Sequence, residues 1–504
     1  MGNDLDYDMM SPEKRKPVAL LPVHVEVRVR QGASARFDTI RNTVYDFITS
    51  SFVHLYLPST LQGWEDVPLL AQSVDRIIAC ESSTPSSSPS IPIEEVSLHI
   101  YVYQPNDSDA FEELASGGGR GDGEEVTAAS MCELPSLEWE GLWESLIYAD
   151  DIKSKLLDYI YATVIFSDAD VDFNVVSWNR LVLLHGPPGT GKTSLCRALA
   201  QKLSIRLSDR YPGARILEIN SHSLFSRWFS ESGKLVQRLF STVNDMVGDE
   251  ETFVIVLIDE VESLTAARAG AMAGTEPSDA LRVVNALLTQ LDKLKRRKNV
   301  LVMATSNLPK AIDTAFVDRA DIIQYVDLPP REAIYEILRT CLVELVAKGV
   351  VSNVDVPSRT QAHLYERSAM SSRTSTATAS VASTAAASTQ ASTTEATPHL
   401  NGLIDPSVDP QERSKHVALK LLVLAQKCRA QGMSGRSLRR LPVLAQARHM
   451  GILPMLPKRR SAGRAGQAAE TSHVATATQV EAWLEAMERV IDSQALEKER
   501  LAKS

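Results

Sequence analysis

Residues 181–194 read LVLLHGPPGTGKTS. A short apolar run leads into a segment, 186–193, that matches the phosphate-loop pattern G-x-x-x-x-G-K-[ST], and the helical pattern SLCRALAQKL follows. The glycines let backbone N–H groups close on a β-phosphate, and the helix N-terminus adds partial positive charge. In such a loop Lys192 bridges the β- and γ-phosphates, and Thr193 supplies a hydroxyl ligand to Mg²⁺. The predicted nucleotide-binding residues of the loop are Gly186, Pro187, Pro188, Gly189, Thr190, Gly191, Lys192, Thr193 and Ser194.

Two further apolar runs end in polar residues that suit this chemistry. The run FVIVLI at 253–258 ends in Asp259-Glu260, which places two carboxylates at the carboxyl end of a buried strand. Asp259 fits a residue of the nucleotide site that serves as a ligand of the metal ion. Glu260 fits the base that orients and polarises an attacking water. The alternative is a pair of strand-end charges that face solvent. The run at 300–304 ends in Thr305-Ser306-Asn307, where Asn307 either hydrogen-bonds the γ-phosphate or the water, or is a simple turn residue.

The pattern around these motifs predicts the fold class. Short apolar runs alternate with helical patterns, which is typical of an α/β domain with a parallel sheet and helices on both faces. Five strands are expected, at 181–184, 216–219, 253–258, 300–304 and 322–326, within a large domain at 134–330.

Helical patterns at 331–348, 411–446 and 479–498 predict a small α-helical lid over 331–504. In residues 368–397, 25 of 30 positions are Ser, Thr or Ala, too little apolar surface to offset the ordering entropy. We therefore predict a disordered insertion at about 357–400, with a continuous helix as the alternative.

The first 130 residues predict a separate α+β domain. Val23, Val25, Val27 and Val29 alternate strictly, which is the pattern of a half-buried strand, and residues 96–103 form a second strand candidate. Ser/Pro-rich residues 82–90 and the glycine-rich segment 116–123 read as loops. This domain either docks a substrate or adaptor or is a folding appendage.

Composition excludes several function classes. Among 504 residues, 53 are basic and 63 acidic, a net charge of −10, which argues against a chain built to grip nucleic acid or anionic lipid. The five cysteines are far apart without a CxxC pair, so neither a disulfide framework nor a zinc module is indicated. Without a signal pattern or an apolar run of roughly 18 residues, a soluble protein with no membrane partner is expected.

The order of phosphate loop, DE strand end and TSN strand end resembles the AAA+ ATPases. LWESLIYADDIKSKLLDYI (142–160), SHSLFSRWFSESGK (221–234), DEVESLTAAR (259–268), AFVDRADI (315–322) and GMSGRSLRRLP (432–442) look like the pachytene checkpoint protein 2 family, also called thyroid receptor-interacting protein 13. The similarity covers roughly residues 134–350 and 410–450. Residues 1–130 match only in general character, and the Ser/Thr/Ala insertion is a departure from the family pattern.

The resemblance implies a homo-hexameric ring that uses ATP and Mg²⁺ to remodel HORMA-domain proteins of the meiotic chromosome axis and spindle checkpoint, with an adaptor. It also implies a nuclear, chromosome-associated protein with a cytoplasmic pool. By the same resemblance Asn307 is sensor 1, Arg436 is the sensor-2 arginine of the lid, and Arg319 is the arginine finger that reaches the neighbouring subunit. A structural ion pair of Arg319 with Asp318 or Asp321 is the alternative.

Trp228-Phe229 stands where these ATPases place a pore loop that grips substrate, and residues 266–279 resemble a second pore-facing loop. The alternative for Trp228 is a packed side chain that covers a helix. Two other functions compete with protein remodelling. One is a nucleotide-gated scaffold that pulls no chain through a pore. The other is a nucleic-acid motor, which the net negative charge argues against.

Overall fold

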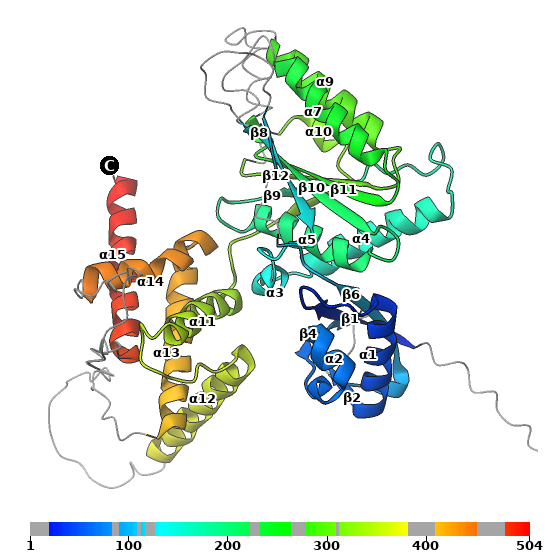
Figure 1. Ribbon diagram of the computed structural model, residues 1–504. Coiled ribbons are helices and arrows are strands. Elements are labelled where there is room, and N and C mark those ends of the chain that lie inside the picture. Colours follow the sequence, from blue (N-terminus) through cyan, green and yellow to red (C-terminus); the bar gives the residue numbers. More distant parts are fainter. Residues whose placement is uncertain are drawn as a thin grey trace, which may run out of the picture.

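The computed structural model describes residues 20–82, 90–107, 112–115, 127–221, 232–263, 279–308, 312–381, 409–450 and 479–503. They form an N-terminal domain, a central α/β domain and a helical lid domain (Figure 1). Within these ranges, no helix is both long and apolar enough to cross a membrane.

The central domain is built on a seven-stranded sheet of order β13-β9-β12-β11-β10-β8-β7. Its first five strands are parallel and are the five that the sequence predicts: β13 (Ile322–Tyr325), β9 (Leu181–His185), β12 (Val300–Ser306), β11 (Thr252–Asp259) and β10 (Gly213–Asn220). The predicted five-stranded parallel sheet is thus confirmed, and the structure extends it by two strands.

The two added strands correct the predicted domain boundary. β8 (Thr127–Leu134) pairs antiparallel with β10, and β7 (Glu112–Ala115) pairs antiparallel with β8. The end of the predicted N-terminal domain at residue 130 therefore falls inside a strand of the central sheet. The physical reason is that the outer edge of β10 exposes a row of unpaired backbone groups, which β8 satisfies.

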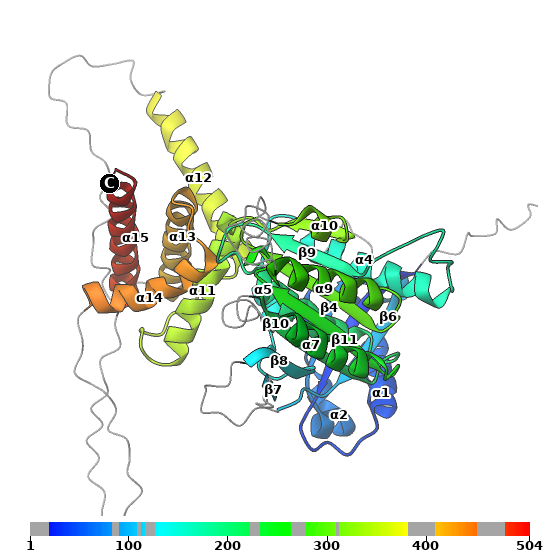
Figure 2. The same cartoon turned by 90° about the horizontal axis from the view of Figure 1, so that it is seen from above.

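Helices cover both faces of this sheet, as predicted (Figure 2). α7 (Ser232–Val247), α9 (Asp279–Leu294) and the short α10 (Thr314–Val317) pack on one face, and α4 (Ile152–Asp168) and α5 (Lys192–Arg206) pack on the other. In β11, Val254 and Val256 join the first core, while Phe253 and Ile255 join the second. A strand buried on both faces has no polar alternation, which is why the sequence shows continuous apolar runs.

In the described part of the lid domain the helices are α11 (Arg331–Ala347), α12 (Arg359–Val381), α13 (Pro410–Ala430), α14 (Gly435–His449) and α15 (Val480–Lys503). The sequence predicts one helical stretch at 411–446, and the structure divides it into α13 and α14. Gly432 adopts a left-handed φ of 59°, and the Ser434 hydroxyl accepts the N–H of Ser437 at 3.4 Å and caps the new helix.

The prediction of disorder at about 357–400 is wrong for residues 359–381, which form α12. Tertiary contacts hold its first turns: Ala362 is buried in the lid core, and Glu366 accepts a hydrogen bond from Arg331 Nη2 at 2.6 Å. Residues 382–400 lie outside the described residues.

The N-terminal domain is α+β, as predicted. Its sheet has the order β3-β4-β1-β6, with β1 (Leu21–Val29) between β4 (Val74–Ser82) and β6 (Val96–Tyr103), and with β3 (Ser59–Thr60) at the edge. α1 (Phe37–Ser51) and α2 (Pro68–Ser73) complete it with the short pair β2 (His54–Tyr56) and β5 (Ser90–Pro92). The four alternating valines of β1 face the domain core.

The opposite face of β1 differs from the expected half-buried strand. Its polar residues His24 and Glu26 are only 8% and 5% exposed. They are buried because this face packs against the C-terminal end of α5, so the N-terminal domain is docked on the central domain through a polar strand face.

Candidate nucleotide site

A cavity of about 400 Å³ lies between the segment that follows β9, the ends of β11 and β12, and the start of α14 in the lid. Among the sequence-predicted residues, its walls contain Pro188, Gly189, Thr190, Gly191, Lys192, Thr193, Ser194, Asp259, Glu260, Asn307 and Arg436. Pro188 and Arg436, which are 248 positions apart, thus meet in one site.

At two glycines of the phosphate loop, a side chain would collide with a neighbouring segment. At Gly186, with φ of 146°, a Cβ atom would stand 2.3 Å from the carbonyl oxygen of Val326. At Gly189, with φ of 78°, a Cβ would stand 2.8 Å from Ser434 Oγ and 3.4 Å from Arg436 Cβ. The lid helix α14 therefore begins directly against the phosphate loop.

Lys192 is the first residue of α5 and is only 5% exposed. Its ammonium group donates to the carbonyl oxygens of Gly186 at 2.9 Å and Pro187 at 2.8 Å. Burial lowers the pKa of Lys192, and the carboxylates of Glu262 and Asp259 oppose this shift. The cation is thus held inside the loop, at the position from which a phosphate-loop lysine acts.

Asp259 and Thr193 lie together as a metal site requires. Thr193 Oγ1 donates to Asp259 Oδ1 at 3.0 Å. A hydroxyl and a carboxylate are hard oxygen ligands, and Mg²⁺ in phosphate-binding sites typically takes one or two protein ligands beside water and phosphate oxygens. The two residues therefore fit the predicted Mg²⁺.

Glu260 directly follows β11 and has a left-handed φ of 58°, which is uncommon for a residue other than glycine. The Ser221 hydroxyl donates to the carbonyl oxygens of Asp259 at 2.5 Å and Glu260 at 2.6 Å and fixes this turn. The side chain of Glu260 is exposed and contributes to the cavity wall. Backbone strain of this kind is typical of positions where a catalytic side chain must be aimed.

Sequence reasoning missed Thr305, which connects the carboxylate of Asp259 to the backbone of Glu260. Its hydroxyl donates to Asp259 Oδ1 and accepts the backbone N–H of Glu260 at 3.3 Å, and the residue is 2% exposed. The neighbouring Asn307 lies on the cavity wall, and its backbone N–H donates to Glu262 Oε1 at 3.0 Å. The sequence signal for Thr305 is its position directly after the apolar run 300–304, two residues before Asn307.

Thr305→Val is expected to slow ATP hydrolysis by about tenfold or more. The substitution keeps the shape but removes a hydrogen bond to a charged group, which contributes about 1.5–3 kcal/mol, and 1.36 kcal/mol is about a factor of ten in rate. Steady-state hydrolysis is the measurement, and Thr305→Ser, which keeps the hydroxyl, is the matched control. Equal rates for the Val and Ser variants would contradict the role.

The lid contributes two arginines rather than the one predicted. Arg436 and Arg439 are exposed, and both contribute to the cavity wall from α14. Residues three apart on a helix share a face, so the two side chains point to the same side of α14. A second wall that the sequence did not reveal consists of Ser145, Leu146, Ile147 and Tyr148, together with Ile337 of α11.

Arg319 does not belong to the cavity of its own chain. Its guanidinium makes two hydrogen bonds to Asp292 of α9, Nε to Oδ1 at 3.0 Å and Nη2 to Oδ2 at 2.9 Å. These bonds raise the pKa of Arg319 and lower that of Asp292. The alternative partners weighed from the sequence, Asp318 and Asp321, are therefore wrong, and Asp321 instead accepts the backbone N–H of Asn179 at 2.7 Å.

The two predicted pore loops cannot be placed. Trp228, Phe229 and residues 266–278 lie outside the described residues. Their assignment stays a prediction.

Comparison with known families matches three parts of the chain. Residues 182–328 match the AAA family, the ATPases associated with various cellular activities. Residues 19–108 match the TRIP13 N-terminal domain, and residues 401–455 match the TRIP13-like AAA+ ATPase lid C-terminal domain. The N-terminal match is more specific than the general likeness seen in the sequence.

Relatives agree with these matches. The pachytene checkpoint protein 2 homolog of Mus musculus is 41% identical over 426 residues, which are 84% of this chain and 87% of the mouse protein. The Homo sapiens homolog is 47% identical over 332 residues, 65% of this chain and 75% of the human protein. The solved structure of C. elegans PCH-2 is similar with a TM-score of 0.62 and 29% identity, covering 96% of this chain and 100% of that one.

The comparisons agree with the geometry of the site. Three family models match along the chain, and relatives align over most of its length. The phosphate loop, the strand-end carboxylates and the lid arginines lie around one cavity. The chain is therefore a nucleotide-binding ATPase that belongs to the pachytene checkpoint protein 2 family of AAA proteins.

Proposed function

We propose that this ATPase is an ATP-driven protein remodeller that works as a homo-hexameric ring on HORMA-domain proteins. The position of Arg319 is the observation that supports a ring of subunits. This arginine lies outside the cavity of its own chain and is held by Asp292. An arginine that acts on a γ-phosphate from this position must do so in the cavity of a second copy, so a complete site requires two neighbouring subunits.

The predicted site residues have separate roles in hydrolysis. The phosphate loop and Lys192 bind the β- and γ-phosphates, and Thr193 and Asp259 would hold Mg²⁺, which when bound would neutralise charge on the phosphates. Glu260 orients the attacking water and accepts its proton, and Asn307 hydrogen-bonds the γ-phosphate or this water. Arg436 senses the phosphates from the lid, whose helix α14 begins against the loop at Gly189.

Remodelling requires force on a client chain, which we assign to Trp228 and Phe229 in a central pore. A well-buried apolar side chain contributes about 1.5–3 kcal/mol, whereas unfolding a domain costs about 5–15 kcal/mol. One loop is therefore too weak, and several subunits must grip together, which favours a ring over a single copy.

Family membership supports the choice of client. Pachytene checkpoint protein 2 relatives align over 84% of this chain, and the N-terminal domain carries the family-specific match. We assign to this domain the docking of a HORMA-domain protein with its adaptor. A role in meiotic recombination and spindle checkpoint control in the nucleus, on chromosomes, with a cytoplasmic pool, belongs to the same proposal.

Trp228→Ala separates the remodeller from a nucleotide-gated scaffold. The variant is expected to bind nucleotide and to form hexamers, because Trp228 belongs to neither the phosphate loop nor the strand-end carboxylates. Client conversion should fall by about tenfold, because truncation of the indole removes the apolar area through which force is transmitted.

The measurement is the rate at which a HORMA-domain protein, with its adaptor and ATP, changes between its two topologies. Trp228→Phe is the control, since a large aromatic ring is kept. Wild-type conversion by the Ala variant would favour the scaffold, and failure of the Ala variant to assemble would show that Trp228 is a core residue.

A further inference from the structure

The segment Glu140–Tyr148 connects the N-terminal domain to the nucleotide cavity. Its last four residues, from Ser145 onward, contribute to the cavity wall. Its first residue, Glu140, forms ion pairs with the N-terminal domain, and the short helix α3 (Leu142–Ser145) lies between the two ends. A few residues therefore join two parts of the molecule that have separate cores.

Two arginines of the N-terminal domain bind Glu140. Arg28 of β1 and Arg76 of β4 stand directly opposite each other in the antiparallel pair. Like charges in that position repel unless a counter-charge lies between them. Glu140 supplies it, because Oε1 accepts from Arg76 Nη2 at 2.5 Å and Oε2 accepts from Arg28 Nη1. The three side chains are 19–36% exposed, so the contact is largely shielded from solvent.

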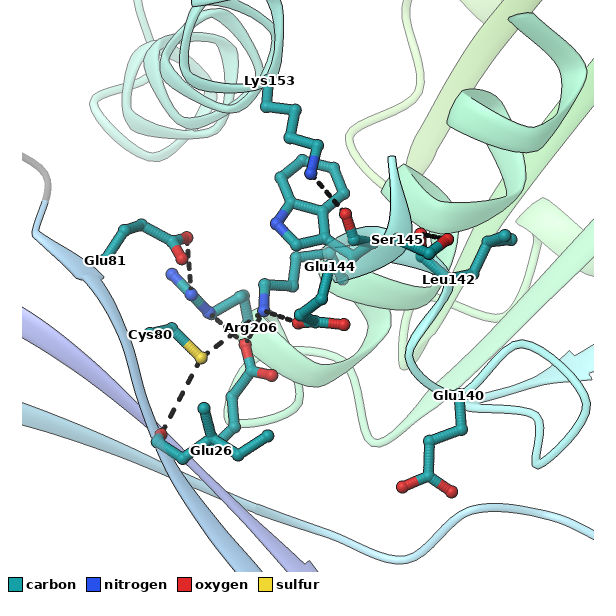
Figure 3. Close-up of polar contacts among 12 residues, drawn as sticks. Glu26, Cys80, Glu81, Glu140, Leu142, Glu144, Ser145, Lys153 and Arg206 are labelled. Atoms are coloured by element: carbon teal, nitrogen blue, oxygen red, sulfur yellow. Dashed lines mark hydrogen bonds and ion pairs between the residues drawn. The ribbon is translucent and has the colours of Figure 1, made fainter. Parts of the chain in front are cut away.

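Lys202 of α5 lies between this strand face and α3. Glu26 of β1 forms an ion pair with Lys202 Nζ at 2.6 Å, and the same ammonium lies 3.7 Å from Glu144 of α3. Figure 3 shows Glu26 and Arg206 meeting beside Glu144, with Ser145 at the far end of α3. The side chains of Lys202 and Glu26 are 3% and 6% exposed. The N-terminal domain thus contacts Glu140 directly, and it reaches α3 only through Lys202 of α5.

The wall that this segment forms suits the base of the nucleotide. The phosphate loop and Asp259 mark the phosphate end of the cavity. Leu146, Ile147 and Tyr148, with Ile337 of the lid, supply apolar surface to the same cavity, and the Tyr148 hydroxyl donates to the Gly191 carbonyl at 3.5 Å. An apolar wall beside a polar, cationic loop matches a ligand with a planar base and a phosphate chain.

We propose that Arg28 and Arg76 of the N-terminal domain are positioning residues for the nucleotide, acting through Glu140 on the base-contacting wall at 145–148. The inference rests on the cavity being the ATPase site. Its consequence is reciprocal coupling, since a partner that displaces these arginines changes nucleotide affinity, and nucleotide changes the affinity for that partner by the same factor.

Glu140→Gln tests the proposal in the full-length protein. We expect the dissociation constant of fluorescently labelled ADP to rise by about tenfold, within the usual range of site-to-site coupling. Binding of inorganic tripolyphosphate, which has no base to contact this wall, should stay at the wild-type value. In steady-state hydrolysis KM should rise while kcat changes little, because the wall acts on binding and Glu260 on chemistry.

Asp209→Asn is the matched control. Asp209 also forms an ion pair with an arginine of the N-terminal domain, Arg41, at 2.6 Å, but it lies outside the segment 140–148. It should leave ADP binding unchanged. The paired substitution Arg28→Gln with Arg76→Gln should reproduce the Glu140→Gln effect from the other domain.

Equal ADP affinity in Glu140→Gln and wild type would overturn the proposal. So would a parallel loss of ADP and tripolyphosphate binding, which would indicate general damage to the fold. Failure of the wild-type protein to bind either probe would instead remove the nucleotide-site assignment, so the two failures are distinguishable.

Discussion

Glu260→Gln is expected to bind ATP with near wild-type affinity and to hydrolyse it about 10²–10⁴-fold more slowly, which is the usual contribution of a general base. The amide keeps the size and the backbone turn of Glu260 but cannot accept the proton of the attacking water. The residue is aimed by its left-handed φ of 58° and by the Ser221 hydroxyl bond to its carbonyl oxygen at 2.6 Å, and neither feature depends on the carboxylate.

Single-turnover hydrolysis and direct binding of ATP separate the two parts of this prediction. Glu251→Gln is a control of the same chemistry, because Glu251 is exposed just before β11 and lies outside the cavity wall. Residual turnover of the Glu260 variant within about tenfold of wild type would remove its assignment as the base.

Glu26→Gln is expected to destabilise docking of the N-terminal domain by about 3–5 kcal/mol, the usual result of removing one partner from a buried ion pair. Lys202 and Arg206 have side chains that are 3% and 1% exposed, and both contact Glu26 Oε1, at 2.6 and 3.0 Å. Arg206 keeps Glu81 at 2.7 Å, but Lys202 would keep Glu144 at 3.7 Å as its nearest counter-charge, beside the weak acceptor Cys80 Sγ at 3.6 Å. A buried ammonium without a close counter-charge is the source of the cost.

Urea unfolding followed by a probe in the N-terminal domain measures this effect, and the transition is treated separately from that of the central domain because a three-domain chain need not unfold in one step. Asp209→Asn removes an exposed ion pair across the same two domains and should change stability by at most about 1 kcal/mol. Similar midpoints for the two variants would show that the cluster at Glu26 contributes little.

The ion pairs of Glu26 with Lys202 and Arg206 also predict how acid affects docking of the N-terminal domain. Burial raises the pKa of Glu26, but the charges of Lys202 and Arg206 outweigh burial and hold it below its usual value of 4.5. The stabilisation is therefore complete above the pKa of the unfolded chain and is lost as the pH falls through the lower pKa of the folded protein. Docking of the N-terminal domain should therefore weaken in acid.

Local sequence patterns were enough for the core of the ATPase. The phosphate loop is contiguous, and Asp259-Glu260 and Thr305-Ser306-Asn307 each follow a strand that is apolar because both of its faces are buried. Parallel strands present their carboxyl ends at one edge, so residues far apart in sequence were expected to meet there, and around the cavity they do. The resemblance to the family added the lid arginine Arg436.

Tertiary structure alone decided the partners of these groups. Arg319 pairs with Asp292 of α9, and Thr305 joins Asp259 to the backbone of Glu260. The strand at 112–115 and its partner completed the central sheet, and α12 formed where composition predicted disorder, because neighbouring elements supplied the contacts.

The polar face of β1 shows the reason most clearly. The alternation of Val23, Val25, Val27 and Val29 states which side of the strand is apolar, and it carries no information about what covers the other side. Glu26 and Arg206 are 180 residues apart, and their hydrogen bond at 3.0 Å exists only because two domains pack together. Periodicity in a sequence reports how apolar each face of an element is, whereas the identity of the covering segment depends on the packing of the whole chain.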